Sequence, residues 1–379
     1  MDPGQVVTPP YVAGPLRLHP FPGLMLAPHR VGDPSTGRAF ARPYRGVAAR
    51  LLRWQARGLV RRDDAPALYL HEYSAAGITI RGLVGALDVS RRATRPEDRA
   101  VLPHEGIHPA QADDLADRMA EMGLNPAPIL LVHNGTARLA TLVAGVAAEP
   151  PAHEFTDRSD QQHRIWAIRD PALLSEIADE LQDSRALIAD GHHRYAAYLR
   201  LQRREPGGAC DLGLAMLVDQ STTPLFLGPI HRSLTGTSLD DLRSAAESLG
   251  MPSRTLTQIE AVAALGPSRL AATDGEEWIV VDLDVPIDRA AVEILHGQLV
   301  PALPHGPANI GYHHSVDDAL AAADPRSTIA VLMPAPSVDL VQRIAEDDRL
   351  LPEKATSFQP KPSLGVLIRS LRDAAAEPS

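Results

Sequence analysis

Short apolar runs recur along the chain between turn residues, a pattern that is typical of buried β-strands. The run GITIRGLVGALDV predicts one or two strands and leads into an exposed connection, SRRATRPEDR. The run PILLVH is closed by an Asn-Gly turn. The predicted strands are 77–89, 128–133, 185–189, 212–220, 224–232, 276–285 and 326–337.

Other segments carry their apolar residues at helical intervals. In ADDLADRMAEMG the leucine and both methionines share one face, and Gly123 suits a C-cap. A second predicted helix, 171–182, starts at a proline, and a third, 238–250, has acidic residues in its first turn. Because helices and strands alternate throughout, the expected fold class is α/β (α+β).

The length of the chain indicates more than one packed unit. Its 379 residues exceed what one hydrophobic core usually accommodates, so two or three units are expected. The predicted segments are an N-terminal α/β segment (1–98), a core (99–235) with an insertion at about 135–183, and a C-terminal α/β segment (236–379).

Charge and cysteine content narrow the function classes. The formal net charge is −10, which disfavours a nucleic-acid partner because such proteins usually present a basic face. The single cysteine, Cys210, excludes an internal disulfide and a thiolate zinc site. No apolar run is long enough to span a bilayer and no secretory signal begins the sequence, so a cytoplasmic protein is expected.

The stretch ALIADGHHRYAAYL (186–199) concentrates polar groups between a buried strand and a helix. Such a turn directs free backbone N–H groups and the positive end of the helix dipole at one point, which favours an anion. Gly191 allows close backbone approach, Arg194 offers a planar fork for phosphate oxygens, and His192 and His193 donate without a permanent charge. Asp190 can orient an imidazole, hold magnesium through water or cap the helix.

This turn has other possible interpretations. Zinc is disfavoured because adjacent histidines point apart and no further ligands have suitable spacing, and no P-loop string occurs in the chain. A purely structural alternative remains open on physical grounds, in which Asp190 caps the helix, the histidines are satisfied core groups and Arg194 makes a surface ion pair.

The sequence IADGHHRYAA closely resembles the hallmark of a prokaryotic domain-of-unknown-function family, numbered one thousand and fifteen, in the ParB/sulfiredoxin superfamily. Four further blocks, in the family's order, resemble it as well, so that the resemblance covers about residues 66–370. They are VLPHEGIHPAQADDLADRMAEMGLNPAPILLVH, HEFTDRSDQQHRIWAI, LFLGPIHRSL and LPEKATSFQPKPSLGVLI. The resemblance implies a ParB/sulfiredoxin-like nucleotide-binding core.

The superfamily implies three kinds of activity, of which one matches this chain best. The reactive cysteine of sulfiredoxin has no counterpart in the turn, and the helix-turn-helix and basic stripe of a ParB-like DNA binder are not found. Free-serine kinases combine a Pro-His-Glu string before a helix with an Asp-Gly-His-[His/Thr]-Arg turn after a strand. This sequence has both, as Pro103-His104-Glu105 and 190–194.

The kinase resemblance implies roles for individual residues. Glu105 acts as the base for the acceptor hydroxyl, and His104 orients it or contacts the acceptor. The turn, with Asp190, Gly191, His192, His193 and Arg194, holds the transferred phosphate. The remaining cations implied at the phosphates are His231, Arg232, Lys354 and Lys361.

The leading hypothesis is therefore a phosphotransferase that uses ATP or ADP and Mg²⁺ to phosphorylate a small, serine-like hydroxyl acceptor. The sequence departs from the family pattern at His29-Arg30 and at Gln111, and the loss of a cation at Gln111 implies weaker phosphate binding or a changed substrate. The alternatives are a nucleotide-binding regulatory or partner-binding protein without kinase activity and, more weakly, a ParB-like DNA-associated protein. No membrane partner is expected, and a homodimer is left open.

Overall fold

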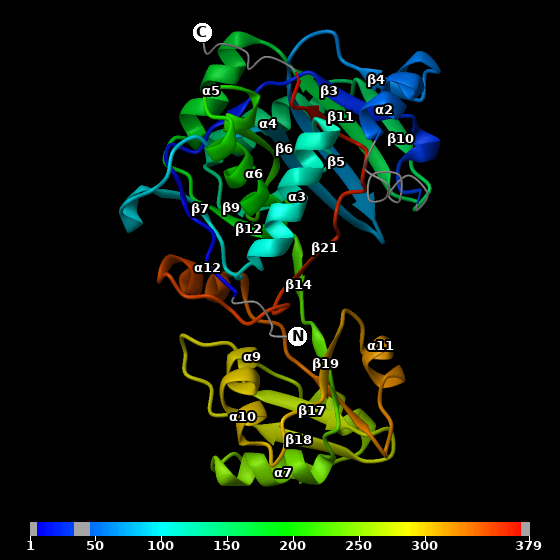
Figure 1. Ribbon diagram of the computed structural model, residues 1–379, viewed down its shortest axis with the longest axis vertical. Helices are drawn as coiled ribbons and strands as arrows, with labels where there is room; N and C mark the ends of the chain where they lie inside the picture. The colour runs from blue at the N-terminus through cyan, green and yellow to red at the C-terminus, as the bar shows by residue number, and fades with distance from the viewer. Residues whose placement is uncertain (1–5, 34–45, 373–379) are drawn as a thin grey trace. The chain divides into compact units, whose positions relative to one another are not determined.

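The structure, a computed structural model, describes residues 6–33 and 46–372 (Figure 1). Parts of the predicted N- and C-terminal segments, residues 1–5, 34–45 and 373–379, lie outside the described residues. The chain divides into two compact units. Unit 1 comprises Met1–Pro103, Ile107–Leu225 and Pro360–Ser379, and unit 2 comprises His104–Gly106 and Phe226–Gln359. These units group the chain differently from the three predicted segments, which stay a prediction.

Unit 1 is built on a ten-stranded mixed sheet, in the order β1-β7-β12-β9-β13-β6-β5-β11-β10 with β2 paired to β6. At its centre β9 runs parallel to β13 and antiparallel to β12. A four-stranded sheet, β4-β3-β22-β8, completes the unit. The strands of the large sheet are β1 (Val12–Ala13), β2 (Leu18–His19), β5 (Leu68–Ala75), β6 (Ile78–Asp88), β7 (Arg99–Leu102), β9 (Ile129–His133), β10 (His153–Thr156), β11 (Gln162–Ile168), β12 (Ala186–Asp190) and β13 (Leu212–Asp219). Those of the small sheet are β3 (Gly23–Leu26), β4 (Val60–Arg62), β8 (Leu124–Asn125) and β22 (Ile368–Ser370).

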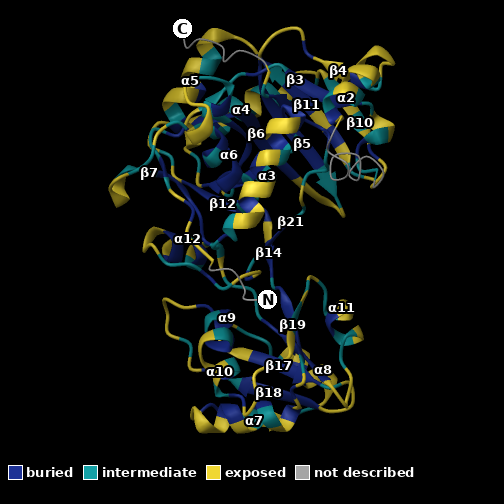
Figure 2. Ribbon diagram, in the orientation of Figure 1, coloured by how far each residue is buried: buried dark blue, intermediate teal, exposed yellow. Residues whose placement is uncertain are grey.

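The helices of unit 1 confirm the helical periodicity read from the sequence. Helix α3 ends at Gly123, whose φ of 66° is the left-handed C-cap expected of glycine. The outer face of α3 is exposed and its other face packs on α6 (Figure 2). The predictions missed α4, whose sequence ARLATLVAGVAA is apolar on most sides. The helices are α2 (Val47–Ala56), α3 (Pro109–Met122), α4 (Ala137–Ala148), α5 (Pro171–Leu181) and α6 (His192–Arg204), with 3₁₀ turns η1 (Pro28–Arg30), η2 (Pro96–Asp98) and η3 (Ala209–Asp211).

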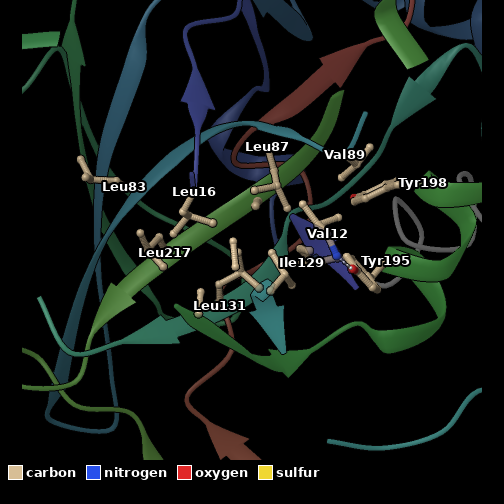
Figure 3. Packing of buried hydrophobic residues seen from close by; sticks show 14 of the residues in the cluster. Val12, Leu16, Leu83, Leu87, Val89, Ile129, Leu131, Tyr195, Tyr198 and Leu217 are labelled. Atoms are coloured by element: carbon tan, nitrogen blue, oxygen red, sulfur yellow. Dashed lines mark hydrogen bonds between the residues drawn. The ribbon is translucent and has the colours of Figure 1, made fainter. Parts of the chain in front are cut away.

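The core of unit 1 holds the strand-turn-helix segment β12–α6 in place (Figure 3). Ile129 of β9 and Tyr195 and Tyr198 of α6 are fully or almost fully buried there. The hydroxyl of Tyr195 accepts a hydrogen bond from the Val12 backbone N–H at 3.0 Å and donates to the Pro10 carbonyl at 2.8 Å. Because its polar tip is satisfied, the buried tyrosine anchors the first turn of α6 without an unpaired donor.

Unit 2 contains a six-stranded antiparallel sheet in the order β16-β18-β17-β20-β15-β19. A separate pair, β14 with β21, lies outside this sheet. Its strands are β14 (Phe226–Gly228), β15 (His231–Thr235), β16 (Ser253–Thr255), β17 (Arg269–Thr273), β18 (Trp278–Asp282), β19 (Asn309–His313), β20 (Thr328–Leu332) and β21 (Ser357–Gln359). Its helices are α7 (Leu239–Ser248), α8 (Gln258–Ala263), α9 (Ala291–Ile294), a π-helical turn η4 (Leu295–Leu299), α10 (Val300–Ala302), α11 (Val316–Ala321) and α12 (Val338–Glu346).

Two sequence predictions about strands are settled by the structure. The run 77–89 forms one strand, β6. The prediction of a single strand at 224–232 is wrong. This run divides into β14, which pairs with β21, and β15, which pairs with β19 and β20. Pro229 lies at the break, where a residue without a backbone N–H interrupts a hydrogen-bonded ladder. The mixed α/β class is confirmed.

Candidate functional site

The turn at 190–194 connects the end of β12 to the start of α6, as the sequence predicts. Gly191 is the N-cap with φ 99° and ψ 31°, and no side chain caps the helix. The first backbone N–H groups of a helix lack intrahelical acceptors and stand at the positive end of its dipole. The turn therefore has the backbone arrangement of an anion site, and the alternative that Asp190 caps the helix is wrong.

Gly191 is required at this turn for two independent reasons. Its positive φ is strained for any residue with a side chain. A Cβ at this position would also lie 3.0 Å from the Ile129 Cγ2 atom and 3.1 Å from the Arg194 Nε atom. A side chain at 191 thus displaces either a core residue or the guanidinium of the turn.

We expect Gly191→Ala to lower the free energy of unfolding by about 1–3 kcal/mol because of this strain, and to weaken phosphate binding as well. The matched control is Gly77→Ala, since Gly77 has a φ of 80° but nothing within 4 Å of an added Cβ. Urea denaturation and nucleotide titration check both effects. Equal losses of stability and unchanged nucleotide affinity in both variants would show that the contact with Arg194 is irrelevant.

Asp190 holds two cations at the turn. Its Oδ2 atom lies 2.5 Å from Arg194 Nη2, and its Oδ1 atom lies 2.5 Å from Lys361 Nζ. Burial alone raises the pKa of Asp190, but Arg194 and Lys361 outweigh burial and hold the pKa below its ordinary value. The carboxylate is ionised, so the three side chains together carry one net positive charge beside the start of α6.

Arg194 is a structural link as well as a cation. Its Nη1 atom donates to the Pro128 carbonyl at 2.5 Å, and Nη2 donates to Asp190. The structural alternative therefore anticipated an ion pair of Arg194 correctly, although Asp190, a member of the same turn, is the partner. The guanidinium is held in one orientation, which favours recognition of a planar or tetrahedral anion.

The segment Pro360–Ser363 positions Lys361. The Tyr73 hydroxyl donates to the Pro360 carbonyl at 2.6 Å. The Gln161 side-chain amide donates to the Lys361 carbonyl at 3.0 Å and accepts from the Ser363 hydroxyl at 3.1 Å. Tyr73 and Gln161 were missed from sequence, because contacts across 287 and 200 residues leave no local pattern.

A buried series of hydrogen-bonded polar side chains stabilises the backbone at Gln161. His71 Nε2 lies 3.0 Å from His163 Nδ1, and His163 Nε2 lies 3.1 Å from Asp157 Oδ2. The Gln161 backbone N–H donates to Asp157 Oδ1 at 3.0 Å. Burial lowers the pKa of His71 and of His163, so both are neutral near pH 7. This series of hydrogen bonds stabilises the loop between β10 and β11 that carries Gln161.

The two histidines of the turn differ in their surroundings. His192 is buried. His193 Nε2 accepts a hydrogen bond from the His108 backbone N–H at 3.1 Å, and the two rings stack with centroids 6.0 Å apart. The Nε2 atom of His193 is therefore engaged at the start of α3, and its predicted contact with phosphate stays a prediction.

Glu105 belongs to unit 2 and is held by the segment before β21. Its Oε1 atom accepts from the Ala355 backbone N–H at 3.1 Å and from the Thr356 hydroxyl at 3.3 Å. Its side chain is 17% exposed. Burial raises the pKa of Glu105 to about 6, although Ala355 and Lys354 oppose the shift. A carboxylate with this pKa is mostly ionised at pH 7 and is a stronger base than an ordinary glutamate.

His104 shares the Thr356 hydroxyl with Glu105. Its Nε2 atom lies 2.8 Å from Thr356 Oγ1, and the His104 side chain is fully buried. The His104 carbonyl also accepts from the Leu351 backbone N–H at 2.8 Å. These bonds connect His104 to the 351–356 segment, and Thr356 contacts the side chains of both His104 and Glu105.

The expectation that His231 and Arg232 present positive charge at the end of a strand is wrong in its geometry. Both residues begin β15. His231 Nδ1 accepts from the Met333 backbone N–H at 3.1 Å, and burial with the nearby Arg232 lowers the pKa of His231 to about 4. The imidazole is therefore neutral at physiological pH and adds no charge.

Arg232 is fully buried and supports the segment that holds Glu105. Its Nη2 atom donates to the Lys354 carbonyl at 3.0 Å and to the Glu353 carbonyl at 3.3 Å, and Nη1 donates to the Ile230 carbonyl at 2.6 Å. Its guanidinium lies 4.7 Å from the centroid of the Tyr312 ring. Arg232 therefore stabilises the backbone of the segment before Ala355 through these hydrogen bonds.

The two predicted lysines fall in different units. Lys361 reaches Asp190 in unit 1, whereas Lys354 is exposed in unit 2, with a φ of 56°. The charge of Lys354 lowers the pKa of Glu105. Of the departures from the family pattern, Arg30 lies over the Trp54 ring at 4.7 Å and Gln111 lies in the first turn of α3.

Asp190 does not fit as a direct ligand of magnesium, because both of its carboxylate oxygens already contact cationic side chains. Within residues 6–33 and 46–372, no group of three or more His, Cys, Asp or Glu side chains is arranged to hold a metal ion. In the same ranges no helix has both the length and the apolar character needed to cross a membrane.

Comparisons with known proteins agree with the sequence resemblance. The profile of the family described as "Protein of unknown function (DUF1015)" matches residues 21–273. This match confirms the family predicted from IADGHHRYAA, over a range that starts and ends earlier than the predicted 66–370. None of the curated proteins matches the chain.

Solved structures resemble the chain only distantly. SbnI with a C-terminal truncation, from Staphylococcus aureus, is 11% identical, with a TM-score of 0.42 over 71% of this chain and 84% of that one. A free serine kinase variant in complex with ADP is 14% identical, with a TM-score of 0.39 over 71% and 89% of the two chains. A conserved hypothetical protein from Pyrococcus furiosus is 15% identical, with a TM-score of 0.38 over 72% and 92%.

Proposed function

The chain belongs to the DUF1015 family, and we propose that it transfers a phosphoryl group from ATP or ADP to the hydroxyl of a small, serine-like acceptor. The observation that carries the proposal is the start of α6. Gly191 is the N-cap there, no side chain accepts from the first backbone N–H groups, and two cationic side chains flank Asp190. The proposal assigns phosphate binding to the turn and the role of the base to Glu105.

Phosphate binding is supported by the chemistry of the turn. Backbone donors at a helix N-terminus bind phosphate oxygens, and Arg194 and Lys361 supply charge that Asp190 only partly neutralises. The ion pair of Lys361 with Asp190 is exposed enough to exchange, since 43% of the lysine side chain is exposed. Lys361 thus exchanges Asp190 for a phosphate at small cost.

The role of the base is supported by the environment of Glu105. Burial raises the pKa of Glu105 to about 6, while Ala355 and Thr356 fix the Oε1 atom. A fixed carboxylate with a pKa near the working pH is suited to take a proton from an alcohol. His104 and Arg232 act as positioning residues, because they bind Thr356 and the 353–354 backbone rather than the acceptor.

The proposed reaction balances without a covalent enzyme intermediate. The acceptor oxygen forms a bond to the terminal phosphorus, and the bond from that phosphorus to the bridging oxygen of the nucleotide breaks. Glu105 takes the hydroxyl proton, and ADP or AMP leaves with the bridging oxygen.

Product analysis tests this function. The protein is incubated with ATP or ADP, Mg²⁺ and serine or a pool of hydroxyl amino acids, and the products are separated by mass spectrometry. We expect a phosphorylated hydroxyl compound that depends on nucleotide and protein. Nucleotide binding without any phosphorylated product would reject the kinase and favour the nucleotide-binding regulatory alternative.

The two lysines of the chain allow the phosphate site to be examined separately. We expect Lys361→Met to weaken nucleotide binding about tenfold, because a charge-assisted hydrogen bond contributes about 1.5 kcal/mol or more. Lys354→Met is the matched comparison, and it tests the predicted phosphate contact of Lys354. Isothermal titration with ATP and Mg²⁺ gives both affinities, and wild-type affinity in Lys361→Met would contradict the assignment of the turn.

A further inference from the structure

Unit 1 contains a cavity of about 150 Å³ between α4 and the large sheet. Most of its wall is aliphatic, and an apolar cavity of about this volume admits a group of roughly benzene's size. Because α4 belongs to the predicted insertion 135–183, the insertion supplies one wall of the cavity. The aliphatic lining consists of Leu70, Leu83, Leu139, Ala140, Val143, Ala144 and Leu217.

Polar side chains line the cavity where two central strands end. His133 is the last residue of β9 and Asp219 the last of β13, and the two are paired in the parallel register. Arg81, from β6, lines the same cavity. Ligands of open α/β sheets bind outside the carboxyl ends of the parallel strands, which is where these side chains lie.

Asp219 presents a carboxylate oxygen to this space. Its Oδ1 atom accepts three hydrogen bonds, from the Gly135 and Ser221 backbone N–H groups and from the Ser221 hydroxyl. Burial raises the pKa of Asp219, but the bonds from Ser221 and Gly135 outweigh burial and hold it below its ordinary value. The carboxylate is therefore ionised, and its Oδ2 atom accepts no hydrogen bond from the described residues.

Arg81 presents the opposite charge. Its Nε and Nη2 atoms donate to Glu72 Oε2 at 2.9 and 2.5 Å, and Arg164 pairs with the other oxygen of Glu72. Two guanidinium groups thus share one carboxylate, which leaves one net positive charge. Nη1 of Arg81 makes no hydrogen bond within the described part of the chain.

His133 completes the polar lining. It is 6% exposed, and burial lowers its pKa, so the ring is neutral near pH 7. Its Nδ1 atom lies 3.4 Å from the Ser184 hydroxyl. Nε2 makes no hydrogen bond to any described residue, so this atom is available to a ligand in the cavity.

We propose that this cavity binds a small zwitterion with one branched aliphatic substituent, namely a branched-chain amino acid such as leucine. Arg81 and Asp219 carry opposite charges, line one cavity and make no ion pair with each other, so a ligand with both charges satisfies both. The ligand ammonium group meets Asp219 Oδ2, its carboxylate meets Arg81 Nη1 and His133 Nε2, and its aliphatic part fills the space beside α4.

This site is separate from the proposed phosphate site. Asp190 pairs with Leu130 near the start of β9, whereas His133 is the last residue of that strand. Because β9 and β12 are antiparallel, the turn and the cavity lie at opposite edges of the sheet. A ligand in the cavity is therefore a second ligand, and its binding does not depend on the proposed kinase activity.

Calorimetric titration of the full chain with L-leucine tests the proposal. Isoamylamine lacks the carboxylate and 4-methylpentanoate lacks the ammonium group. We expect one leucine to bind per chain and each analogue to bind at least tenfold more weakly. Equal affinities for the three compounds, or no leucine binding by protein with native circular dichroism, would overturn the proposal.

Variants distinguish the cavity from other surfaces. Ala140→Phe fills the cavity from α4 and should weaken leucine binding at least tenfold, with ATP affinity unchanged. The control Thr141→Phe adds the same ring at an exposed position of the helix. Arg81→Gln leaves the cavity open, and this variant should bind leucine as weakly as the wild-type protein binds isoamylamine. It therefore provides the test if Ala140→Phe fails to fold. Wild-type leucine affinity in folded Arg81→Gln would overturn the assignment of the carboxylate partner.

Discussion

Replacing Glu105 with glutamine is expected to lower the rate of phosphoryl transfer at pH 7 by a factor of about 10²–10⁴, the usual contribution of a general base. The variant keeps the Oε1 acceptor for Ala355 and Thr356, so the 351–356 segment should stay in place. The affinity for nucleotide, which the proposal assigns to the turn, should change by less than twofold.

The rate of the wild-type enzyme should also fall as the pH drops through about 6. Burial raises the pKa of Glu105 to about 6, so below that pH the carboxyl is mostly protonated and cannot accept the hydroxyl proton. Glu276→Gln, at an exposed position in the same unit, is the control and should keep the wild-type rate and pH profile. Steady-state kinetics between pH 5 and 8 measure both effects. A Glu105→Gln enzyme that retains the wild-type rate would remove Glu105 from the mechanism.

Replacing Arg232 with methionine is expected to lower the free energy of unfolding of unit 2 by about 3 kcal/mol. The methionine keeps much of the volume but leaves the carbonyls of Lys354 and Ile230 without the buried donor that they share, and losing the partner of a desolvated carbonyl costs about 1–3 kcal/mol. The loss of the hydrogen bonds from Arg232 also makes the segment that positions Glu105 less ordered, so the transfer rate should fall as well.

The matched control for Arg232 is an exposed arginine of the same unit. Arg254 pairs with Asp282 at the surface, at 45% and 30% exposure, so Arg254→Met should cost less than about 1 kcal/mol. Urea denaturation followed by circular dichroism measures both variants. If Arg232→Met is as stable as Arg254→Met, the carbonyl contacts of Arg232 do not stabilise the unit.

The strand-turn-helix at 186–204 was predictable because its signals are local. An apolar run, a glycine and an amphipathic segment follow one another directly, and the structure has β12, Gly191 and α6 in that order. The same local reasoning located the end of α3 at Gly123. It failed at 224–232, where the apolar run continues through Pro229 although the two halves pair with different strands.

The supports of the candidate site were beyond sequence reasoning because they join distant segments. Lys361 reaches Asp190 from 171 residues away, and Thr356 binds Glu105 from 251 residues away. The contacts of Arg232 could not be predicted for the same reason, since a buried arginine that donates to backbone carbonyls has no distinct sequence pattern. The family resemblance singled out Lys361, Asp190, Glu105 and Arg232 but not Thr356, and only the structure shows what each one contacts.

A crystal structure of the protein with ADP tests the central claim most directly. The account predicts the phosphate oxygens within hydrogen-bond distance of the backbone N–H groups at the start of α6, with Lys361 Nζ turned from Asp190 toward the phosphate. Phosphates bound away from residues 190–194, with the Lys361–Asp190 ion pair intact, would contradict it.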